Sequence, residues 1–384
     1  MFNNIWTIII SIFVFALMVA IHEFGHFSVA KLFGIRVNEF AIGMGPVLWK
    51  KKHKETLYSL RAIPMGGFCQ MEGEDSYSDD ERSFGKAAWY KRFAVVAAGA
   101  ILNIILGFVI LLIIQMSSAN ITTTVIDNFT PNTNLVNSSF QPGDRIVALG
   151  DTKINIFEDL SFELNRITDK PVDVSVIRGG EKITQTITPV KQDITYIYGE
   201  DEFVFTSTVN GVLDQKQTVA APDSEQYKAL IGTTQTQSRY ILGFEALQQK
   251  QTFTSAIKNA FFLTIYNIKV VYVSLYELIR GAADVSQISG PIGIINVIGQ
   301  ASKINASALF NLVALLTINL GIMNLLPIPA LDGGKLFIII IEAITRKKLP
   351  PEREGIIQLI GFVLLISILL FATYNDILRL FSAR

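Results

Sequence analysis

The sequence is poor in cysteine and histidine, and it has no excess of charge of either sign. Its single cysteine, Cys69, excludes an internal disulfide framework and any zinc site built from paired cysteines. We therefore interpret Cys69 as a small apolar side chain. Basic and acidic residues are equally numerous, 33 of each, so the chain has no surplus of positive charge for binding nucleic acid.

Long apolar runs are present instead, and 50% of the 384 residues are hydrophobic. Four runs are long enough to cross a bilayer as helices, and they cover residues 5–24, 93–116, 308–328 and 356–374. The first run has no lysine or arginine before it and no small-residue cleavage site after it. We expect it to be a retained transmembrane helix and not a signal peptide.

A fifth apolar run, residues 256–279, carries Lys258, Lys269 and Glu277 at intervals along its length. An amphipathic helix in the membrane interface fits this pattern better than a span does. A further transmembrane helix is the alternative, because the run is long enough to cross the bilayer.

Basic residues in the loops predict the orientation of the spans. Lysine and arginine are frequent between residues 27 and 92, and the loop before the last run contains Arg346, Lys347, Lys348 and Arg353. With both basic loops in the cytoplasm, four spans place both termini and the segment 117–255 outside. The expected location is the inner or plasma membrane, with several passes.

Alternating patterns predict strands in two regions. The segments VNEFAIG, TLYSLRAIP and GFCQME, after the first span, predict short strands in a small sheet or hairpin at the membrane surface. Residues 122–190 alternate in the same way, and FQPGDRIVALGD resembles the core signature of a PDZ domain, which binds an extended peptide as an added strand. Residues 191–252 are polar and predict a linker or a few extra strands.

The expected fold is an α-helical polytopic membrane protein. It has about four transmembrane helices, a membrane-associated β-hairpin or sheet, and one extracytoplasmic PDZ-like β-rich domain. Residues 1–116 are expected to form the first two spans with the β loop, and residues 117–192 the PDZ-like domain. Residues 193–255 are expected to be a polar linker or extra strands. Residues 256–300 should form an interfacial helix with a return segment, and residues 301–384 the last two spans.

Two of the three histidines lie in the motif HEFGH, at the end of the first apolar run. On a helix, His22 and His26 point to the same side, which lets two imidazole nitrogens bind one zinc ion, and Glu23 can then take a proton from water at the metal. HExxH also arises by chance. However, ionisable groups at membrane depth cost roughly 2–3 kcal/mol each, and a zinc site returns on the order of 10 kcal/mol. We therefore favour zinc, and expect the third histidine, His53, to be solvated.

A catalytic zinc site needs a third protein ligand and an open position. Glu39 and Asp332 are the two candidates. We favour Asp332 because it interrupts the apolar segment NLLPIPALDGG, whereas Glu39 lies in a strand-like pattern. The alternative role for Asp332 is an N-cap for the following helix.

Asparagines near the candidate site have open roles. Pro327 breaks the helix after Asn319 and Asn324, and these amides could hold a substrate carbonyl or a developing oxyanion. Hydrogen bonding between helices is the alternative, and it is nearly as good for Asn319. Asn103 lies between glycines on one face of the second span, which favours a structural or positioning role.

The motifs HEFGH, GAILN and NLLPIPALDGG, in this order, resemble the site-2 protease family of intramembrane zinc metalloproteases. Their spacing and the PDZ-like module between them are most similar to the bacterial regulator-of-sigma-E protease type. The resemblance implies that His22, His26 and Asp332 bind Zn2+ and that Glu23 activates water.

The same resemblance implies how a substrate is held. Asn324, and less surely Asn319, would align the substrate strand or stabilise the tetrahedral intermediate. The strands around Gly66 and Gly67 would pair with an unwound substrate segment.

The length of the first span predicts the depth of the site. Residues 5–21 span roughly 26 Å as a helix, so His22 should lie towards the cytoplasmic side of a core about 30 Å thick.

The expected function is therefore intramembrane hydrolysis of peptide bonds in single-span membrane proteins. The resemblance suggests anti-sigma factors or signal-peptide remnants as substrates, with a site-1 protease making the first cut. The partners are then such substrates and the lipid bilayer, and not nucleic acid. The alternative function is a metal-binding membrane scaffold that recruits partners through its PDZ-like module. A zinc transporter would need more acidic or histidine residues in its spans.

Overall fold

The computed structural model describes residues 2–74, 77–222, 225–228, 230–281 and 290–382. The chain divides into two compact units. Unit 1 comprises Met1–Gln115 and Leu263–Arg384, and unit 2 comprises Met116–Phe262. Residues 282–289, within the predicted return segment 256–300, lie outside the described residues.

Five helices among the described residues are long and apolar enough to cross a membrane: α1 (Phe2–Leu32), α2 (Trp89–Ser117), α5 (Phe253–Ile279), α7 (Ala306–Leu325) and α9 (Pro351–Ser382). The sequence predicted about four, and α5 is the additional one. The polar residues that favoured an interfacial helix do not interrupt α5, since lysine and glutamate are good helix formers. Length and composition therefore leave both alternatives for α5 open.

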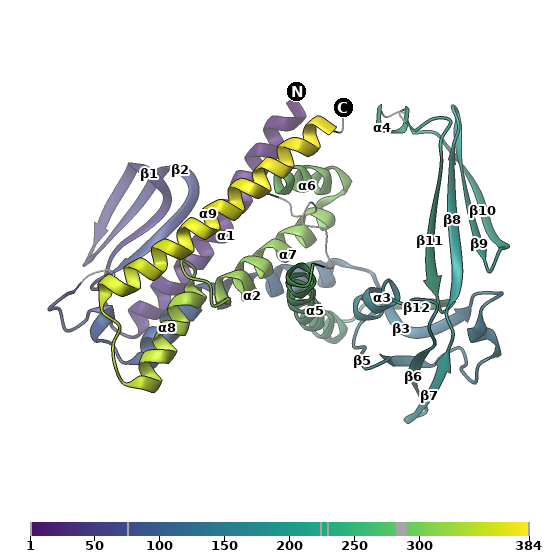
Figure 1. The fold of residues 1–384 in the computed structure, drawn as a ribbon, viewed down its shortest axis with the longest axis horizontal. Helices are drawn as coiled ribbons and strands as arrows, with labels where there is room; N and C mark the ends of the chain where they lie inside the picture. The colour runs from purple at the N-terminus through teal and green to yellow at the C-terminus, as the bar shows by residue number, and fades with distance from the viewer. Residues whose placement is uncertain (1, 75–76, 223–224, 229, 282–289, 383–384) are drawn as a thin grey trace. The chain divides into compact units, whose positions relative to one another are not determined.

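Two shorter helices pack among the long ones in unit 1. The helix α6 (Pro291–Ile304) contacts α1, α7 and α9, and α8 (Asp332–Thr345) contacts α7 (Figure 1). The carboxylate of Asp376 on α9 accepts hydrogen bonds from the backbone N–H groups of Gly290 and Gly293, at 3.1 and 2.8 Å. These bonds satisfy donors that the start of α6 would otherwise leave unpaired, and they fix α6 to α9.

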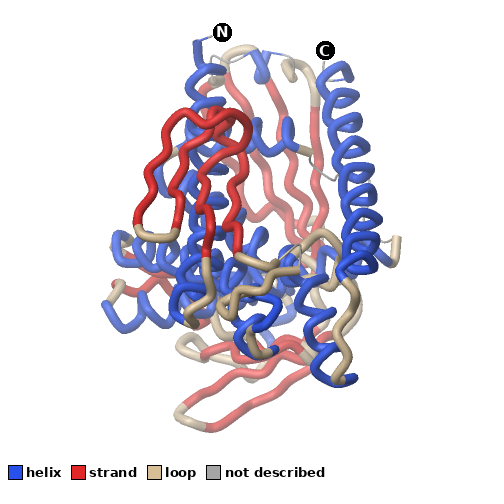
Figure 2. The backbone as a smooth tube through the Cα atoms, turned by 90° about the vertical axis from the view of Figure 1, so that its left-hand side faces the viewer, coloured by secondary structure: helices blue, strands red, loops and turns tan. Residues whose placement is uncertain are grey.

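The sheet of unit 1 is built from two long strands, β1 (Val37–His53) and β2 (Thr56–Met71), where the sequence predicted several short ones. Both strands bend, so that residues 39–42 of β1 pair with residues 57–60 of β2 on one side and with residues 67–70 on the other (Figure 2). Positive φ angles at Gly43, Gly45 and Gly66 permit these bends. Residues 67–70 therefore form an edge of this sheet among the described residues.

A shared apolar core joins the sheet of unit 1 to the helices that carry the HEFGH motif and Asp332. Ala30 of α1, Val37 of β1, Cys69 of β2, Val95 of α2 and Leu336 of α8 are all buried in this one cluster. Cys69 is a free thiol in that core. Because side chains of five elements pack together in this cluster, α1, α2 and α8 keep a fixed geometry around the HEFGH motif.

Unit 2 contains two antiparallel sheets. The first has the order β12-β3-β4-β6-β7, with β5 paired to β4, and the second has the order β10-β9-β8-β11. The strands of the first sheet are β3 (Asn120–Phe129), β4 (Arg145–Leu149), β5 (Thr152–Lys153), β6 (Val172–Arg178), β7 (Glu181–Ile187) and β12 (Phe244–Lys250). Those of the second are β8 (Val190–Tyr198), β9 (Glu202–Val209), β10 (Val212–Ala220) and β11 (Thr234–Ile241).

Residues 193–255, for which the sequence left a linker or extra strands open, hold strands of both sheets. The last of them, β12, pairs with β3 at the other end of unit 2. Local patterns do not reveal this pairing, because β3 and β12 are far apart in the sequence, with the strands β4 to β11 between them. Two short helices complete the unit, α3 (Phe157–Leu164) and α4 (Glu225–Lys228).

The PDZ-like signature contains an ion pair that stabilises unit 2. Asp144 is 1% exposed, and its carboxylate accepts two hydrogen bonds of 2.7 Å from the Arg178 guanidinium. These bonds hold the pKa of Asp144 below its usual value. The stabilisation is therefore fully present above the unfolded-state pKa of about 3.9, and it is lost as pH falls through the lower folded-state pKa.

We expect Asp144→Asn to lower the free energy of unfolding of unit 2 by about 1–3 kcal/mol at neutral pH, because Arg178 loses its charged partner. The difference from wild type should shrink as pH falls from about 4 towards the lower pKa of the folded state, because the wild-type Asp144 carboxylate is then protonated in the unfolded chain before it is protonated in the folded one. Hydrogen exchange of β4 and β6 in the full-length protein, corrected for the intrinsic rate at each pH, measures this. Asp193→Asn, which alters the exposed Lys191–Asp193 pair, is the control. Equal protection in Asp144→Asn and wild type at pH 7 would contradict the prediction.

Candidate metal centre

Two imidazoles meet on one face of α1. His22 and His26 are one helical turn apart and each is 8% exposed. Their Nε2 atoms are 3.2 Å apart. The α-helical spacing brings these two nitrogens to one side, as the sequence predicts.

A carboxylate from the other end of the chain completes the cluster. Asp332 is the first residue of α8, and its Oδ2 lies 3.1 Å from His22 Nε2 and 3.3 Å from His26 Nε2. The N-cap position of α8 is Leu331, so Asp332 does not take the alternative role of N-cap. Among the described residues, His22, His26 and Asp332 form the one group of three that could hold a metal ion.

The other acidic candidate, Glu39, lies elsewhere. Its carboxylate accepts hydrogen bonds from Ser59 and Arg61 within the sheet, at 2.6 and 2.7 Å. It is therefore engaged by a hydroxyl and a guanidinium, and it is not part of the histidine cluster. His53, at the end of β1, is exposed, in agreement with its predicted solvation.

The cluster has the dimensions of three ligands around one zinc ion. Tetrahedral zinc with bonds of about 2.0–2.1 Å separates its ligand atoms by roughly 3.3 Å. The three distances found here are 3.2, 3.1 and 3.3 Å. Asp332 Oδ2 is also buried without a hydrogen bond of good geometry from any described residue, which is unfavourable for a carboxylate that binds nothing. The donor set and its geometry therefore fit zinc.

Comparison with known proteins identifies the family. Residues 10–368 match the peptidase family M50. The chain belongs to this family, that of the site-2 proteases. A relative from Clostridium acetobutylicum is 33% identical over 97% of this chain and 98% of its own length. The protein named zinc metalloprotease RasP from Oceanobacillus iheyensis is 28% identical over 98% of this chain and 99% of its own length.

Membership makes the protein a site-2 type zinc metalloprotease of the membrane. The family assignment accounts for the donor set, since two imidazoles and one carboxylate leave one position of tetrahedral zinc open for chemistry.

Glycines of this M50 peptidase give the imidazoles their space. A Cβ on Gly99 of α2 would lie 2.4 Å from His26 Nε2 and 2.9 Å from His22 Cε1. A Cβ on Gly25 of α1 would lie 2.5 Å from the Ala98 carbonyl oxygen. The two glycines therefore let α1 and α2 approach closely enough for α2 to line the metal site.

The loop that precedes Asp332 is held by α9, which the sequence analysis did not anticipate. The backbone N–H of Ala330 donates to Gln358 Oε1 at 2.5 Å, and Ala330 has a φ of +71°, which is strained for a residue with a Cβ. A Cβ on Gly361 would lie 2.2 Å from the Pro329 carbonyl oxygen. The only sequence signal was the spacing of Gln358 and Gly361, which places both on one side of a helix.

The predicted substrate-positioning residues are placed as follows. A Cβ on Gly67 would lie 3.3 Å from Glu23 Cγ, so the edge segment of β2 passes directly beside Glu23. Gly66, with a φ of +85°, is the preceding bend. Asn319 and Asn324 are half-buried on α7, and neither amide bonds to a described residue. The structure thus brings Gly67 next to Glu23, with Gly66 adjacent in the chain, while the substrate-binding roles of the glycines and of the two asparagines stay predictions.

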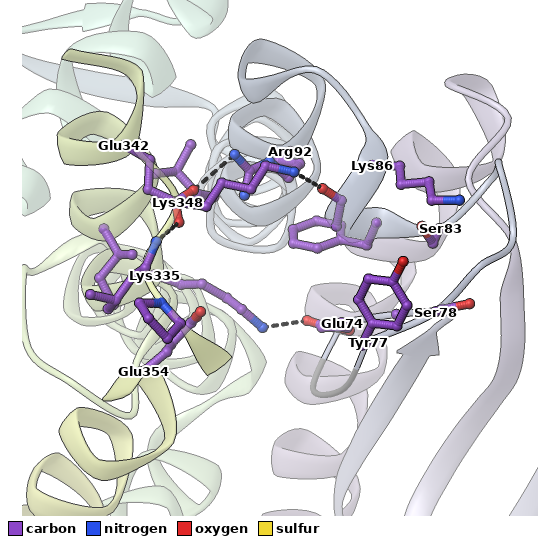
Figure 3. Close-up of a pocket in the computed structure, with 17 residues that line it drawn as sticks. Glu74, Tyr77, Ser78, Ser83, Lys86, Arg92, Lys335, Glu342, Lys348 and Glu354 are labelled. Carbon is purple, nitrogen blue, oxygen red and sulfur yellow. Dashed lines mark hydrogen bonds and ion pairs between the residues drawn. The ribbon is translucent and has the colours of Figure 1, made fainter. Parts of the chain in front are cut away.

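Two cavities adjoin α8. One, of about 560 Å³, has Asp332, Gln358 and Lys335 in its wall. The other, of about 330 Å³, lies between the loop after β2 and the second half of α8. The ion pair of Glu74 and Lys335, 2.6 Å long, lines both cavities, and Figure 3 shows the two side chains pointing towards each other. The wall beside Asp332 is therefore polar on the side of this ion pair.

Proposed function

We propose that the protein hydrolyses peptide bonds within or near the transmembrane segments of single-span membrane proteins. The observation that carries the proposal is the cluster of His22 Nε2, His26 Nε2 and Asp332 Oδ2, with Glu23 beside it, in an M50 peptidase. Three ligands from two apolar segments are hard to explain without a metal, and a base next to them has no use in a scaffold.

Each residue has a proposed chemical role. His22, His26 and Asp332 hold zinc, which when bound polarises the scissile carbonyl and acidifies water. The Glu23 carboxylate accepts the proton of the attacking water and then gives it to the leaving amine. The amides of Asn324 and Asn319 donate to the substrate carbonyl or to the oxyanion that develops from it.

The edge of the unit 1 sheet is the proposed binding site for the unwound substrate. A helical substrate hides its carbonyl groups in its own hydrogen bonds, so it must adopt an extended form before attack. Residues 67–70 pair with β1 on one side and with no described residue on the other. Backbone pairing with this free edge would place the substrate next to Gly66 and Gly67, beside Glu23.

Charge supports a cytoplasmic position for the active site. The basic loops 33–88 and 346–350 lie on one side of the membrane if α2 and α7 are the spans between them. A spanning α5 would put the loops on opposite sides, so we propose that α5 lies in the interface. Unit 2 would then be extracytoplasmic, and the cavity next to Asp332 would be the route by which water reaches the site from the cytoplasm.

Unit 2 is proposed to bind an extended peptide in a PDZ-like manner. A cavity of about 270 Å³ lies between α3 and the segment that joins β11 to β12. Gly243, with a φ of +90°, turns the chain at this point, and Arg239 lines the same cavity. Such a groove could screen substrates, including the remnants left by a site-1 protease.

The test is cleavage of a single-span anti-sigma factor or signal-peptide remnant by the purified, reconstituted protein. Zinc-loaded protein should cut the substrate in the cytoplasmic half of its span, as mapped by mass spectrometry. Removal of zinc with a chelator should stop cleavage, and added zinc should restore it. A protein that binds zinc and peptide but leaves all such substrates intact would favour the scaffold alternative.

A further inference from the structure

Among the described residues, Asn103 on α2 makes the one side-chain contact to His22 Nδ1, the ring nitrogen that does not face Asp332. Its side chain is 0% exposed, and its Nδ2 atom lies 3.3 Å from His22 Nδ1. His26 has a corresponding partner on the same helix, because its Nδ1 lies 2.9 Å from the Val95 carbonyl oxygen. The helix α2 thus contacts both imidazoles on the side away from Asp332.

The proton positions decide what these contacts do. A neutral imidazole that binds a metal through Nε2 carries its proton on Nδ1, and this N–H needs an acceptor. The Val95 carbonyl is such an acceptor for His26. For His22 the facing atom has to be the Asn103 oxygen, since an amide NH2 opposite an N–H gives two donors and no bond.

The geometry of the Asn103 amide permits this orientation. As placed, Asn103 Oδ1 is buried and receives no hydrogen bond from a described residue. The O and N of an amide are assigned from their hydrogen bonds, and a half-turn of the group exchanges them. The exchange puts Oδ1 about 3.3 Å from the His22 Nδ1–H and gives it a donor.

We infer that Asn103 is a positioning residue for the zinc site. It accepts a hydrogen bond from His22 Nδ1–H, which fixes the tautomer and the ring so that Nε2 points at the metal. The inference rests on the proposed roles of His22, His26 and Asp332. It extends them, since it states that the metal affinity depends on a side chain that does not touch the metal.

Helix packing is the competing explanation of a buried asparagine in a span. Asn103 lies against α7, where a Cβ on Gly321 would be 3.4 Å from Asn103 Cβ. A packing role predicts that substitution lowers the stability of the fold and leaves zinc affinity as it is. A positioning role predicts that zinc affinity follows the presence of an acceptor at position 103.

The experiment compares Asn103→Leu, which removes the acceptor at similar volume, with Asn103→Asp, which keeps it. Zinc affinity of the full-length protein in detergent is measured by competition with a chelator, and the absorption spectrum of bound Co2+ reports the ligand geometry. Asn103→Leu should bind zinc about 10–100-fold more weakly, and Asn103→Asp should stay within about 3-fold of wild type. The Co2+ spectrum should change only in Asn103→Leu.

The control is Thr317→Val, another loss of a polar group at a 0% exposed position in α7, where the hydroxyl bonds to the Val313 carbonyl. It should leave zinc affinity unchanged. If Asn103→Leu does not fold, Asn103→Ala replaces it, since it also lacks an acceptor. Wild-type affinity in the acceptor-free variant, with a lower unfolding temperature, would overturn the inference and leave the zinc site intact. Absence of zinc from wild type would overturn the zinc site itself, and the inference with it.

Discussion

Glu23→Gln is expected to abolish peptide-bond cleavage while zinc stays bound. Glutamine has the size and shape of glutamate but cannot accept the proton of water or pass it to the leaving amine. General acid–base catalysis accelerates a reaction by about 10²–10⁴-fold, so the cleavage rate of Glu23→Gln should be lower than the wild-type rate by at least this factor. Zinc content should be unchanged, because the ligands His22, His26 and Asp332 are intact. Metal analysis and a cleavage assay on the same purified sample measure both quantities.

The inactive Glu23 variant also allows substrates to be identified, since bound single-span proteins should accumulate on it and can be recovered by mass spectrometry. Glu81→Gln is the matched control, because the Glu81 side chain is 90% exposed and its loss should change neither zinc nor activity. Cleavage at the wild-type rate by Glu23→Gln would show that Glu23 is not the base.

Gly99→Ala is expected to remove both zinc and activity. The added Cβ would lie 2.4 Å from His26 Nε2 and 2.7 Å from His26 Cε1, closer than any real contact. The helices cannot separate easily, since Gly25 already packs against the Ala98 carbonyl. The imidazoles must therefore turn away from Asp332. The turn of the imidazoles displaces the ligands themselves. The loss of zinc affinity should therefore exceed the ~10–100-fold loss that follows removal of a residue that only hydrogen-bonds to a ligand. Chelator competition measures it.

Gly107→Ala provides a matched control on the same helix. A Cβ there would lie 2.4 Å from Ile318 Cγ1, so the substitution is as crowded but touches α7 and not the histidines. It should lower the unfolding temperature, since overpacking costs typically 1–3 kcal/mol, and it should keep zinc bound. A Gly99→Ala protein that keeps full zinc affinity while it loses stability would refute the prediction.

Local periodicity was enough to predict the parts of the site that lie within one element. The spacing of His22 and His26 on a helix follows from its 3.6-residue repeat alone. Asp332 was selected because an acid in apolar sequence needs a partner, and chemistry left few candidates. Strand patterns indicated a sheet after the first span, but not the bends that make residues 67–70 an edge beside Glu23.

Contacts between distant segments were not predictable from local patterns. Gln358 accepts a hydrogen bond from Ala330, and β12 pairs with β3. Neither the residue types nor their spacing in the sequence predicts these pairings. The crowding around Gly99 is of the same kind. A glycine in a membrane helix is common, and only the position of α1 shows that this one faces the zinc ligands.

The sequence by itself determined the membrane class, the strand-rich insert, and which side chains had the chemistry to bind zinc, because composition and periodicity are properties of short segments. The tertiary structure alone decided that Asn103 and Val95 contact the Nδ1 atoms of the two histidines, and it placed Asp332, which the sequence already favoured, and not Glu39 beside their Nε2 atoms. These relations depend on how α1, α2 and α8 pack in three dimensions. That packing is the joint result of many small contacts spread over the whole chain, and no single motif encodes it.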